Sequence, residues 1–240
     1  MNPVAKLCGV LILAIPVVIS IDLVTAGVVA LAAVVYGLIR VPLRQLLLRC
    51  IPLFIAAPMS GLSMLLYARP GGREYFHFLA ATVSDNSIGL ALAIGLRVFA
   101  LALPVMVMFY GVDATELGDA LGQVWKLPHR FVIGAISAVR MVALAGEDWA
   151  SIMRARRARG IGGLRAQLTG AFGLFVALLR RGDRLATAME ARAFGPTPRT
   201  WARPSRLGRI DALFLLGCAA LAALAIWVSV ATGAWRVLGL

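Results

Sequence analysis

Long apolar runs, separated by short polar and basic clusters, set the pattern of this chain. A transmembrane helix needs about 20 predominantly apolar residues, because a helix rises ~1.5 Å per residue. Five runs reach or approach this length, and we predict that each spans a membrane: residues 7–21, 23–39, 51–68, 88–110 and 213–235. The first run is short and contains Pro16, so it is either kinked or partly interfacial. The pattern therefore predicts about five spans, within a range of four to six.

Two further apolar runs are predicted to stay outside the bilayer. Residues 131–146 form a run of only 16 residues that contains Arg140, and an arginine at the centre of a span costs about 2.5–3.5 kcal/mol on insertion scales. Residues 168–179 have the length of a core helix and are flanked by Arg165 and Arg180. With the N-terminus inside, a crossing by residues 131–146 would place the following arginine cluster outside, against the positive-inside tendency.

The predicted fold class is therefore an all-α integral membrane protein with an additional cytoplasmic helical subdomain. Residues 1–112 hold the N-terminal spans, residues 113–209 form the cytoplasmic region, and residues 210–240 contain the last span. Residues 69–85 are rich in turn formers and are predicted to be a loop on the far side of the membrane. Apolar helices outside lipid must pack on each other or on a partner.

Composition and charge sharpen this assignment. The chain is 61% hydrophobic, 15% charged and has a mean hydropathy of +0.88, which excludes an ordinary soluble domain, whose charged fraction is about 25%. Of its 24 basic residues, 13 lie between positions 154 and 209. Such a block is retained on the cytoplasmic side and can also meet anionic lipid, nucleic acid or an acidic protein.

The first run lacks a small-residue cleavage pattern and is predicted to be a retained span. The three cysteines have no metal-ligand spacing, so no metal or cofactor is expected.

Two short motifs in the basic block are the candidate functional residues: Ala158-Arg159-Gly160 and Ala191-Arg192-Ala193. Alanine favours a helix, and glycine commonly stands just past a helix C-terminus. Gly160 follows the first arginine at once, and Gly195 follows the second three residues on, so we predict that each arginine lies at a helix end. A planar guanidinium with five donors suits a pair of carboxylate oxygens. The two helix ends are interpreted as plugs for acidic pockets on a partner; the alternative is that both arginines are ordinary positive-inside charges.

The ordered set of motifs resembles the transmembrane (T) component of energy-coupling factor (ECF) transporters, the ABC-type importers of vitamins and of cobalt or nickel ions. Ala158-Arg159-Gly160 is similar to the first Ala-Arg-Gly-like motif of that family, and the second differs only in the alanine at 193. The similarity covers nearly the whole chain and includes further matches: Asn2-Pro3 with Lys6, Arg97, Glu116-Leu117, Ala120-Leu121, Leu127-Pro128, and Arg140 with Glu147. The chain departs from the family at residues 111–115, which lack a pair of threonines.

This resemblance implies a coupling subunit rather than an enzyme. Two ABC ATPase subunits, as a homo- or heterodimer, are expected to receive Arg159 and Arg192. A separate membrane protein, the substrate-binding S component, is expected to dock on the coupling helices and to bring in a vitamin or a transition-metal ion. Arg97, Arg140 and Glu147 are expected to support the coupling region. The resemblance places the chain in the plasma membrane of a bacterium or archaeon, as a multi-pass protein with a cytoplasmic N-terminus and no nucleic-acid partner.

Three other functions are weighed against this reading. A membrane enzyme is disfavoured because the sequence has no nucleophile–base set and no P-loop pattern. A stand-alone channel or carrier is disfavoured because Arg97 is the single charge clearly inside a predicted span. A basic membrane anchor for an acidic partner, or for nucleic acid, is the third alternative, since the arginines of residues 154–159 also suit phosphates.

Arg97, and Arg140 together with Glu147, each allow two interpretations. Arg97 is either a functional residue within the membrane or the structural partner of Asp85 or of a neighbouring helix. Arg140 and Glu147 lie seven residues apart on one helical face, where they either tie helices of the cytoplasmic region together or are simply solvated.

Overall fold

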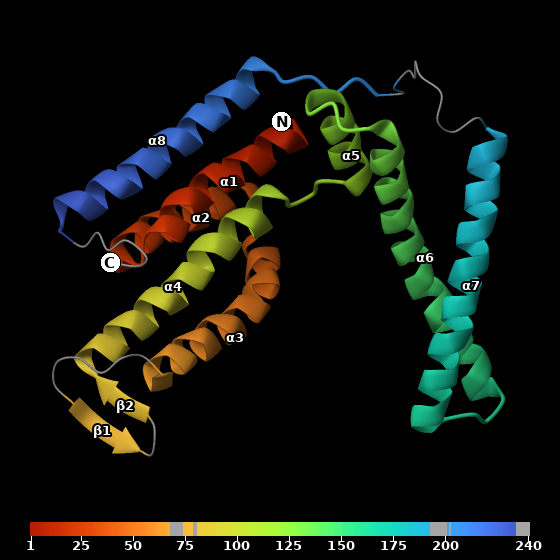
Figure 1. The fold of residues 1–240 in the computed structure, drawn as a ribbon, viewed down its shortest axis with the longest axis horizontal. Helices are drawn as coiled ribbons and strands as arrows, with labels where there is room; N and C mark the ends of the chain where they lie inside the picture. The colour runs from red at the N-terminus through yellow and green to blue at the C-terminus, as the bar shows by residue number, and fades with distance from the viewer. Residues whose placement is uncertain (68–73, 79–80, 193–200, 202, 234–240) are drawn as a thin grey trace. The chain divides into compact units, whose positions relative to one another are not determined.

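A computed structural model describes residues 1–67, 74–78, 81–192, 201 and 203–233 of the chain (Figure 1). The chain separates into two compact units, Met1–Val112 with Leu207–Leu240, and Asp113–Arg206. The first is called the membrane unit and the second the helical unit. The elements are, in order, α1 (Pro3–Ile19), α2 (Leu23–Arg40), α3 (Leu43–Tyr67), β1 (Glu74–Phe78), β2 (Ala81–Ser84), α4 (Asp85–Met108), α5 (Ala114–Val124), α6 (His129–Ala158), α7 (Gly163–Ala191) and α8 (Arg209–Ala231).

The helices confirm the predicted class of an all-α integral membrane protein. Within the described residues, four helices are long and apolar enough to cross a membrane, namely α2, α3, α4 and α8. Helix α1 is apolar but has only 17 residues and contains Pro16, which agrees with the short first run. Neither α6 nor α7 is among the candidate spans, although they have 30 and 29 residues. The protein is therefore a multi-pass membrane protein with four or five spans.

One predicted loop contains regular structure. Strands β1 and β2 pair as an antiparallel hairpin inside residues 69–85, with Phe78 opposite Ala81 and an irregularity between Glu74 and Phe76. Aromatic and β-branched residues, which fit a pleated strand, are concentrated in this segment (Tyr75, Phe76, Phe78, Thr82 and Val83). The Gly and Pro residues beside them dominate the sequence pattern, so the hairpin inside the predicted loop was not anticipated.

Buried hydrogen bonds tie α8 to both ends of α1, directly at the start of α1 and through the α1–α2 link at its end, and they show that α1 and α8 run parallel. Near their starts, the backbone N–H of Asn2 donates to Oδ1 of Asp211 over 2.8 Å. Near their ends, the hydroxyl of Ser229 donates to Oδ2 of Asp22 over 2.6 Å. Asn2 also caps α1 by accepting from the backbone N–H of Val4. The Asn2–Asp211 contact therefore joins two residues that also cap the starts of their own helices.

The remaining helices of the membrane unit pack closely around α4. Helix α2 runs parallel to it, because Gly27 lies against Leu96 and Gly37, further along, lies against Val107. A Cβ at Gly37 would stand 3.0 Å from the Val107 side chain, so glycine permits the close approach. Helix α3 runs antiparallel to α4, and a Cβ at Gly61 would meet the Ala91 carbonyl oxygen at 3.1 Å.

These directions bring one end of every membrane helix together. The ring of Tyr36, near the end of α2, lies 6.2 Å from the ring of Phe214, near the start of α8. The Arg49 guanidinium, near the start of α3, lies 5.0 Å from the ring of Tyr110, just past α4. This end carries Lys6, Arg40, Arg44 and Arg49 and is called the basic end. The chain therefore leaves the membrane unit after Val112 and returns at Leu207 from the same, basic end.

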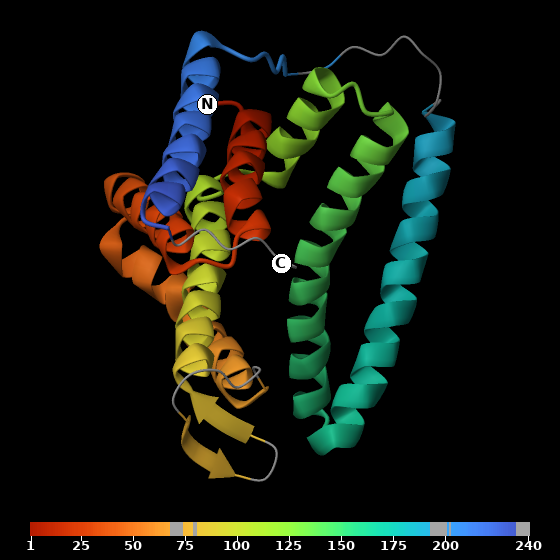
Figure 2. The same cartoon turned by 60° about the vertical axis from the view of Figure 1, so that its left-hand side comes forward.

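The helical unit is an antiparallel pair of long helices, α6 and α7, with the short α5 packed against α6 (Figures 1 and 2). Gly170 of α7 permits the closest approach, because a Cβ there would overlap the Met153 side chain and stand 3.4 Å from the ring of Trp149. An ion pair between Arg181 and Asp148, with 2.8 Å between Nη1 and Oδ2, also joins the two helices. The ring of Trp201 covers Gly122 of α5 and packs edge-on against His129.

Candidate coupling sites

Arg159 lies directly after the last residue of α6, where a glycine reverses the chain. The backbone N–H of Gly160 donates to the Arg157 carbonyl over 3.0 Å, and that of Ile161 donates to the Arg156 carbonyl over 3.1 Å. This pair of bonds closes a helix when the residue after the cap is left-handed, and Gly160 has φ of +72°. A side chain at that angle would be strained. The predicted position of the first arginine at a helix end is confirmed.

Arg192 occupies the corresponding position after α7. Its backbone N–H donates to the carbonyls of Ala188 over 3.2 Å and Met189 over 3.1 Å, and its φ and ψ of −92° and 17° depart from the helix. Ala191 is the last helical residue. Ala193 and Gly195 lie outside the described residues. The second arginine therefore also lies at a helix C-terminus.

Both side chains are exposed, and neither forms an ion pair or side-chain hydrogen bond with any residue that the structure describes. Other arginines of the helical unit are engaged. Arg156 donates to the Ala166 carbonyl over 3.3 Å and to the Thr169 hydroxyl, which ties the end of α6 to α7. Arg157 donates to the Met153 carbonyl of its own helix. The two motif arginines are thus available to a partner.

The two arginines lie at opposite ends of the α6–α7 pair. Arg159 precedes α7 and Arg192 follows it, and the 29 residues of that helix extend over ~43 Å. Figure 1 shows that α7 is continuous along this length. One pocket on a partner cannot receive both guanidinium groups, so the arrangement provides two separate docking points.

An apolar face of α7 is uncovered in the isolated chain. Ala166 and Gly170 are buried toward α6, whereas the face about half a turn away is exposed. Its members recur every three or four residues, as neighbours on one helical face do: Leu164 (72% exposed), Leu168 (64%), Phe172 (69%), Phe175 (57%) and Leu179 (58%). A contiguous stripe of exposed large apolar side chains marks a surface that meets protein or lipid.

The two charged residues of α6 that were predicted to support the coupling region are not the ones that form the ion pair between α6 and α7. Arg140 and Glu147 are both exposed on α6, and neither pairs with another charge among the described residues. The next residue along, Asp148, supplies the ion pair with Arg181 that joins α6 and α7. The sequence could not select Asp148 over Glu147, because the choice depends on which face of α6 meets α7.

Arg97 has a structural partner in a neighbouring helix. Its Nη2 donates to the Val18 carbonyl oxygen over 2.8 Å. Val18 is in the last turn of α1, and carbonyl groups in the last turn of a helix receive no hydrogen bond from within that helix. This contact supports the structural reading of Arg97, with α1 as the partner.

A buried carboxylate at the opposite end from the basic one was not identified from the sequence. Asp22 is 6% exposed and caps α2 by accepting from the backbone N–H of Thr25 over 2.7 Å. Its oxygens also accept from the hydroxyls of Ser20, Thr25 and Ser229. Burial by itself would raise the pKa of Asp22, but the hydrogen bonds from Ser20, Ser229 and Thr25 together outweigh it and lower the pKa below its ordinary value.

Comparison with known proteins assigns the family. The model of the CbiQ family, described as cobalt transport protein, matches residues 1–201, which include the membrane helices α1–α4 and both arginine motifs. The chain belongs to the CbiQ family. This membership confirms the resemblance to T components that the motifs indicated.

Three curated proteins that are similar to this chain share one name. The chain is 27% identical over 205 residues to the "Energy-coupling factor transporter transmembrane protein EcfT" of Exiguobacterium sibiricum, covering 79% of this chain and 78% of the relative. It is 26% identical over 201 residues to the protein of the same name from Limosilactobacillus fermentum, covering 75% of each. A third, from Ruminiclostridium cellulolyticum, is 26% identical over 148 residues, or 55% of each chain.

Proposed function

We propose that this chain is the coupling subunit of an ECF-type importer, which transmits ATP hydrolysis by two partner ATPases to a substrate-binding S component. The observation that carries the proposal is the pair of exposed arginines at two helix ends ~43 Å apart. Family membership and the names of the relatives support it. The imported substrate is a vitamin or a transition-metal ion, and the S component rather than this chain selects it.

The separation of the arginines fits one ATPase subunit at each helix end. A guanidinium forms two parallel hydrogen bonds to a carboxylate and gains strength where water is excluded. Arg159 and Arg192 protrude just beyond their helices, so each enters an acidic groove with little steric hindrance from Ala158, Gly160 or Ala191. A rigid-body movement of the two ATPases would then move α6 and α7.

The exposed stripe of α7 is the surface proposed for the S component. Phe172 and Phe175 lie at its centre, and burying such aromatic side chains is a major source of interface energy. The stripe faces away from α6, so the S component could cover it without opening the helix pair.

The basic end of the membrane unit orients the protein in this proposal. Lys6, Arg40, Arg44 and Arg49 gather there, and basic residues near spans are retained on the cytoplasmic side. The N-terminus and both connections to the helical unit lie at that end. We therefore assign the N-terminus and the helical unit to the cytoplasm of a bacterial or archaeal cell.

Substitution of the two arginines tests the proposal. Removing one partner of a buried ion pair costs about 3–5 kcal/mol, which corresponds to a loss of about 100-fold or more in affinity. We expect Arg159→Ala and Arg192→Ala each to weaken co-purification of the ATPases and substrate uptake, and the double variant to abolish both. Affinity purification with mass spectrometry and an uptake assay measure the two effects.

Arg184→Ala is the matched control, because Arg184 is an exposed arginine within α7 that lies away from either helix end. It removes the same charge and should leave assembly and uptake unchanged. Wild-type uptake by the double variant would refute the proposal, as would an equal loss in the control.

A further inference from the structure

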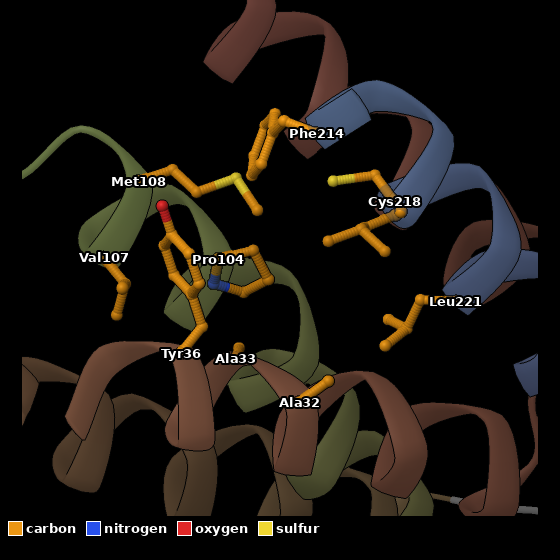
Figure 3. Close-up of a pocket in the computed structure, with 11 residues that line it drawn as sticks. Ala32, Ala33, Tyr36, Pro104, Val107, Met108, Phe214, Cys218 and Leu221 are labelled. Carbon is orange, nitrogen blue, oxygen red and sulfur yellow. The ribbon is translucent and has the colours of Figure 1, made fainter. Parts of the chain in front are cut away.

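An apolar cavity of about 220 Å³ lies within the membrane unit, between α2 and α4 on one side and α8 on the other, with Leu13 of α1 at its edge. Figure 3 shows the rings of Tyr36 and Phe214 and the thiol of Cys218 directed toward it. Its volume exceeds the ~150 Å³ of an engineered apolar cavity that binds benzene. The helices around it are membrane helices, so the surrounding medium offers acyl chains rather than water.

The cavity lies next to the basic end. Tyr36 is one helical turn, ~6 Å, from Arg40 along α2, and the Arg40 guanidinium carbon lies 5.8 Å from the centre of the Tyr36 ring. Arg40 is exposed and forms no ion pair with a described residue. Lys6 shares a helical face with Leu13 on α1, about 10 Å toward the same end. The cavity therefore lies at the depth of the lipid acyl chains, and Arg40 and Lys6 lie at the depth of the lipid headgroups.

We propose that this site binds an anionic phospholipid, with one acyl chain in the cavity and the phosphate at Arg40. The aliphatic walls contributed by Pro104, Val107 and Leu221 suit an acyl chain. An arginine beside them attracts the phosphate of an anionic headgroup more strongly than that of a zwitterionic headgroup, whose own cation offsets the phosphate charge. The lipid bridges α2 and α4 to α8 across the space that separates their side chains. The proposal does not depend on the coupling function.

Gly217 provides a way to fill the cavity. It lines the cavity, and a Cβ there would meet no atom within 4 Å. Gly217→Phe should therefore add a side chain at the cavity wall, where the first carbon of that side chain has room. Gly89→Phe is the matched control, because Gly89 of α4 also has no atom within 4 Å of such a Cβ and does not line the cavity.

Native mass spectrometry of the full chain, titrated with phosphatidylglycerol or with phosphatidylcholine of identical acyl chains, tests the site. One basic residue near the surface should favour phosphatidylglycerol by about fivefold. Arg40→Ala should remove this preference and leave phosphatidylcholine binding unchanged, whereas Arg40→Lys should keep it. Gly217→Phe should lose binding of both lipids, and Gly89→Phe should bind as the wild type does.

Equal affinity of the wild type for the two lipids would overturn the proposal, and so would wild-type binding of phosphatidylglycerol by Gly217→Phe. A thermal transition in detergent shows whether Gly217→Phe is folded. Where it is not, Arg40→Ala decides alone, since an exposed side chain can be truncated without disturbing the core. An unchanged preference in that variant refutes the assignment.

Discussion

Four arginines of the helical unit differ in what their guanidinium groups contact. Arg156 and Arg181 contact groups of the facing helix and hold α6 to α7. Arg159 and Arg192 lie past the ends of those helices, are exposed, and form no ion pair with a described residue. Glycine placement predicted Arg159 at a helix end because a left-handed residue leaves a sequence signal. No such signal distinguishes Arg156 from its neighbours, since its role depends on the register between two helices.

Asp22 is a buried carboxylate of the membrane unit that accepts hydrogen bonds from three hydroxyl groups and one backbone N–H. Because the folded-state pKa is lowered, the network stabilises the fold above the unfolded value of about 3.9, and this contribution is lost as pH falls through the lower folded value. We expect Asp22→Asn to destabilise the protein by about 1.5–3 kcal/mol at pH 7, as the loss of hydrogen bonds to a charged group does. The difference from wild type should shrink in acid.

Thermal unfolding in detergent between pH 3 and pH 7 measures this effect. Asp113→Asn is the control, because Asp113 is an exposed carboxylate at the start of α5 whose side chain forms no capping hydrogen bond. A stability difference for Asp22→Asn that does not change with pH would show that the carboxylate charge is not what the hydroxyls stabilise.

The sequence predicts where most helices of the membrane unit lie along the chain, but it does not predict which faces of these helices pack together. Helix α2 ends within a residue of its predicted limit, and α4 and α8 begin and end within about four residues of theirs. Length and hydropathy suffice for this. Helix α3 departs further, because it begins at Leu43, eight residues before the predicted start of its apolar run. The faces that pack were not predictable, because a helix that is apolar all round carries no stripe to indicate its neighbour. The β1–β2 hairpin was missed because two short strands carry a weak signal beside Gly and Pro.

The α6–α7 pair depends on a glycine at its point of closest approach. A leucine at Gly170 would displace the terminal methyl of Met153, and the rest of its side chain would have to fit beside the Trp149 ring between the two helices. We therefore expect Gly170→Leu to destabilise the pair by about 1–3 kcal/mol. Hydrogen exchange of the α6 and α7 amides should increase, and ATPase co-purification should fall, because the spacing of the two arginines is no longer held.

Gly173→Leu is the control for this variant. Gly173 is also in α7, but a Cβ there would meet no atom within 4 Å. The substitution should be neutral or should stabilise the helix by up to about 1 kcal/mol, which is the helix propensity gained over glycine. Equal hydrogen exchange in the two leucine variants would contradict the role given to Gly170.

At the scale of the whole molecule, the direction of each membrane helix constrains the topology of the chain. Asn2 contacts Asp211 at the start of α8, so the N-terminus and the chain entering α8 lie on one side of the membrane. Helix α1, at 17 residues, is ~26 Å long, against a hydrocarbon core of ~30 Å. Local thinning of the bilayer can accommodate a shortfall of this size, so we expect α1 to cross the membrane as a fifth span.

Reporter fusions test this topology. Green fluorescent protein folds only in the cytoplasm, and alkaline phosphatase is active only outside it. We expect a fluorescent protein to be bright at the N-terminus and after Gly162 in the α6–α7 link, and dark at the C-terminus, with phosphatase giving the reverse. If α1 did not cross, the N-terminus and the link would report opposite sides, in conflict with the Asn2–Asp211 hydrogen bond. Phosphatase activity at Gly162 together with a bright N-terminus would therefore refute both the five-span count and the cytoplasmic position of the two arginines.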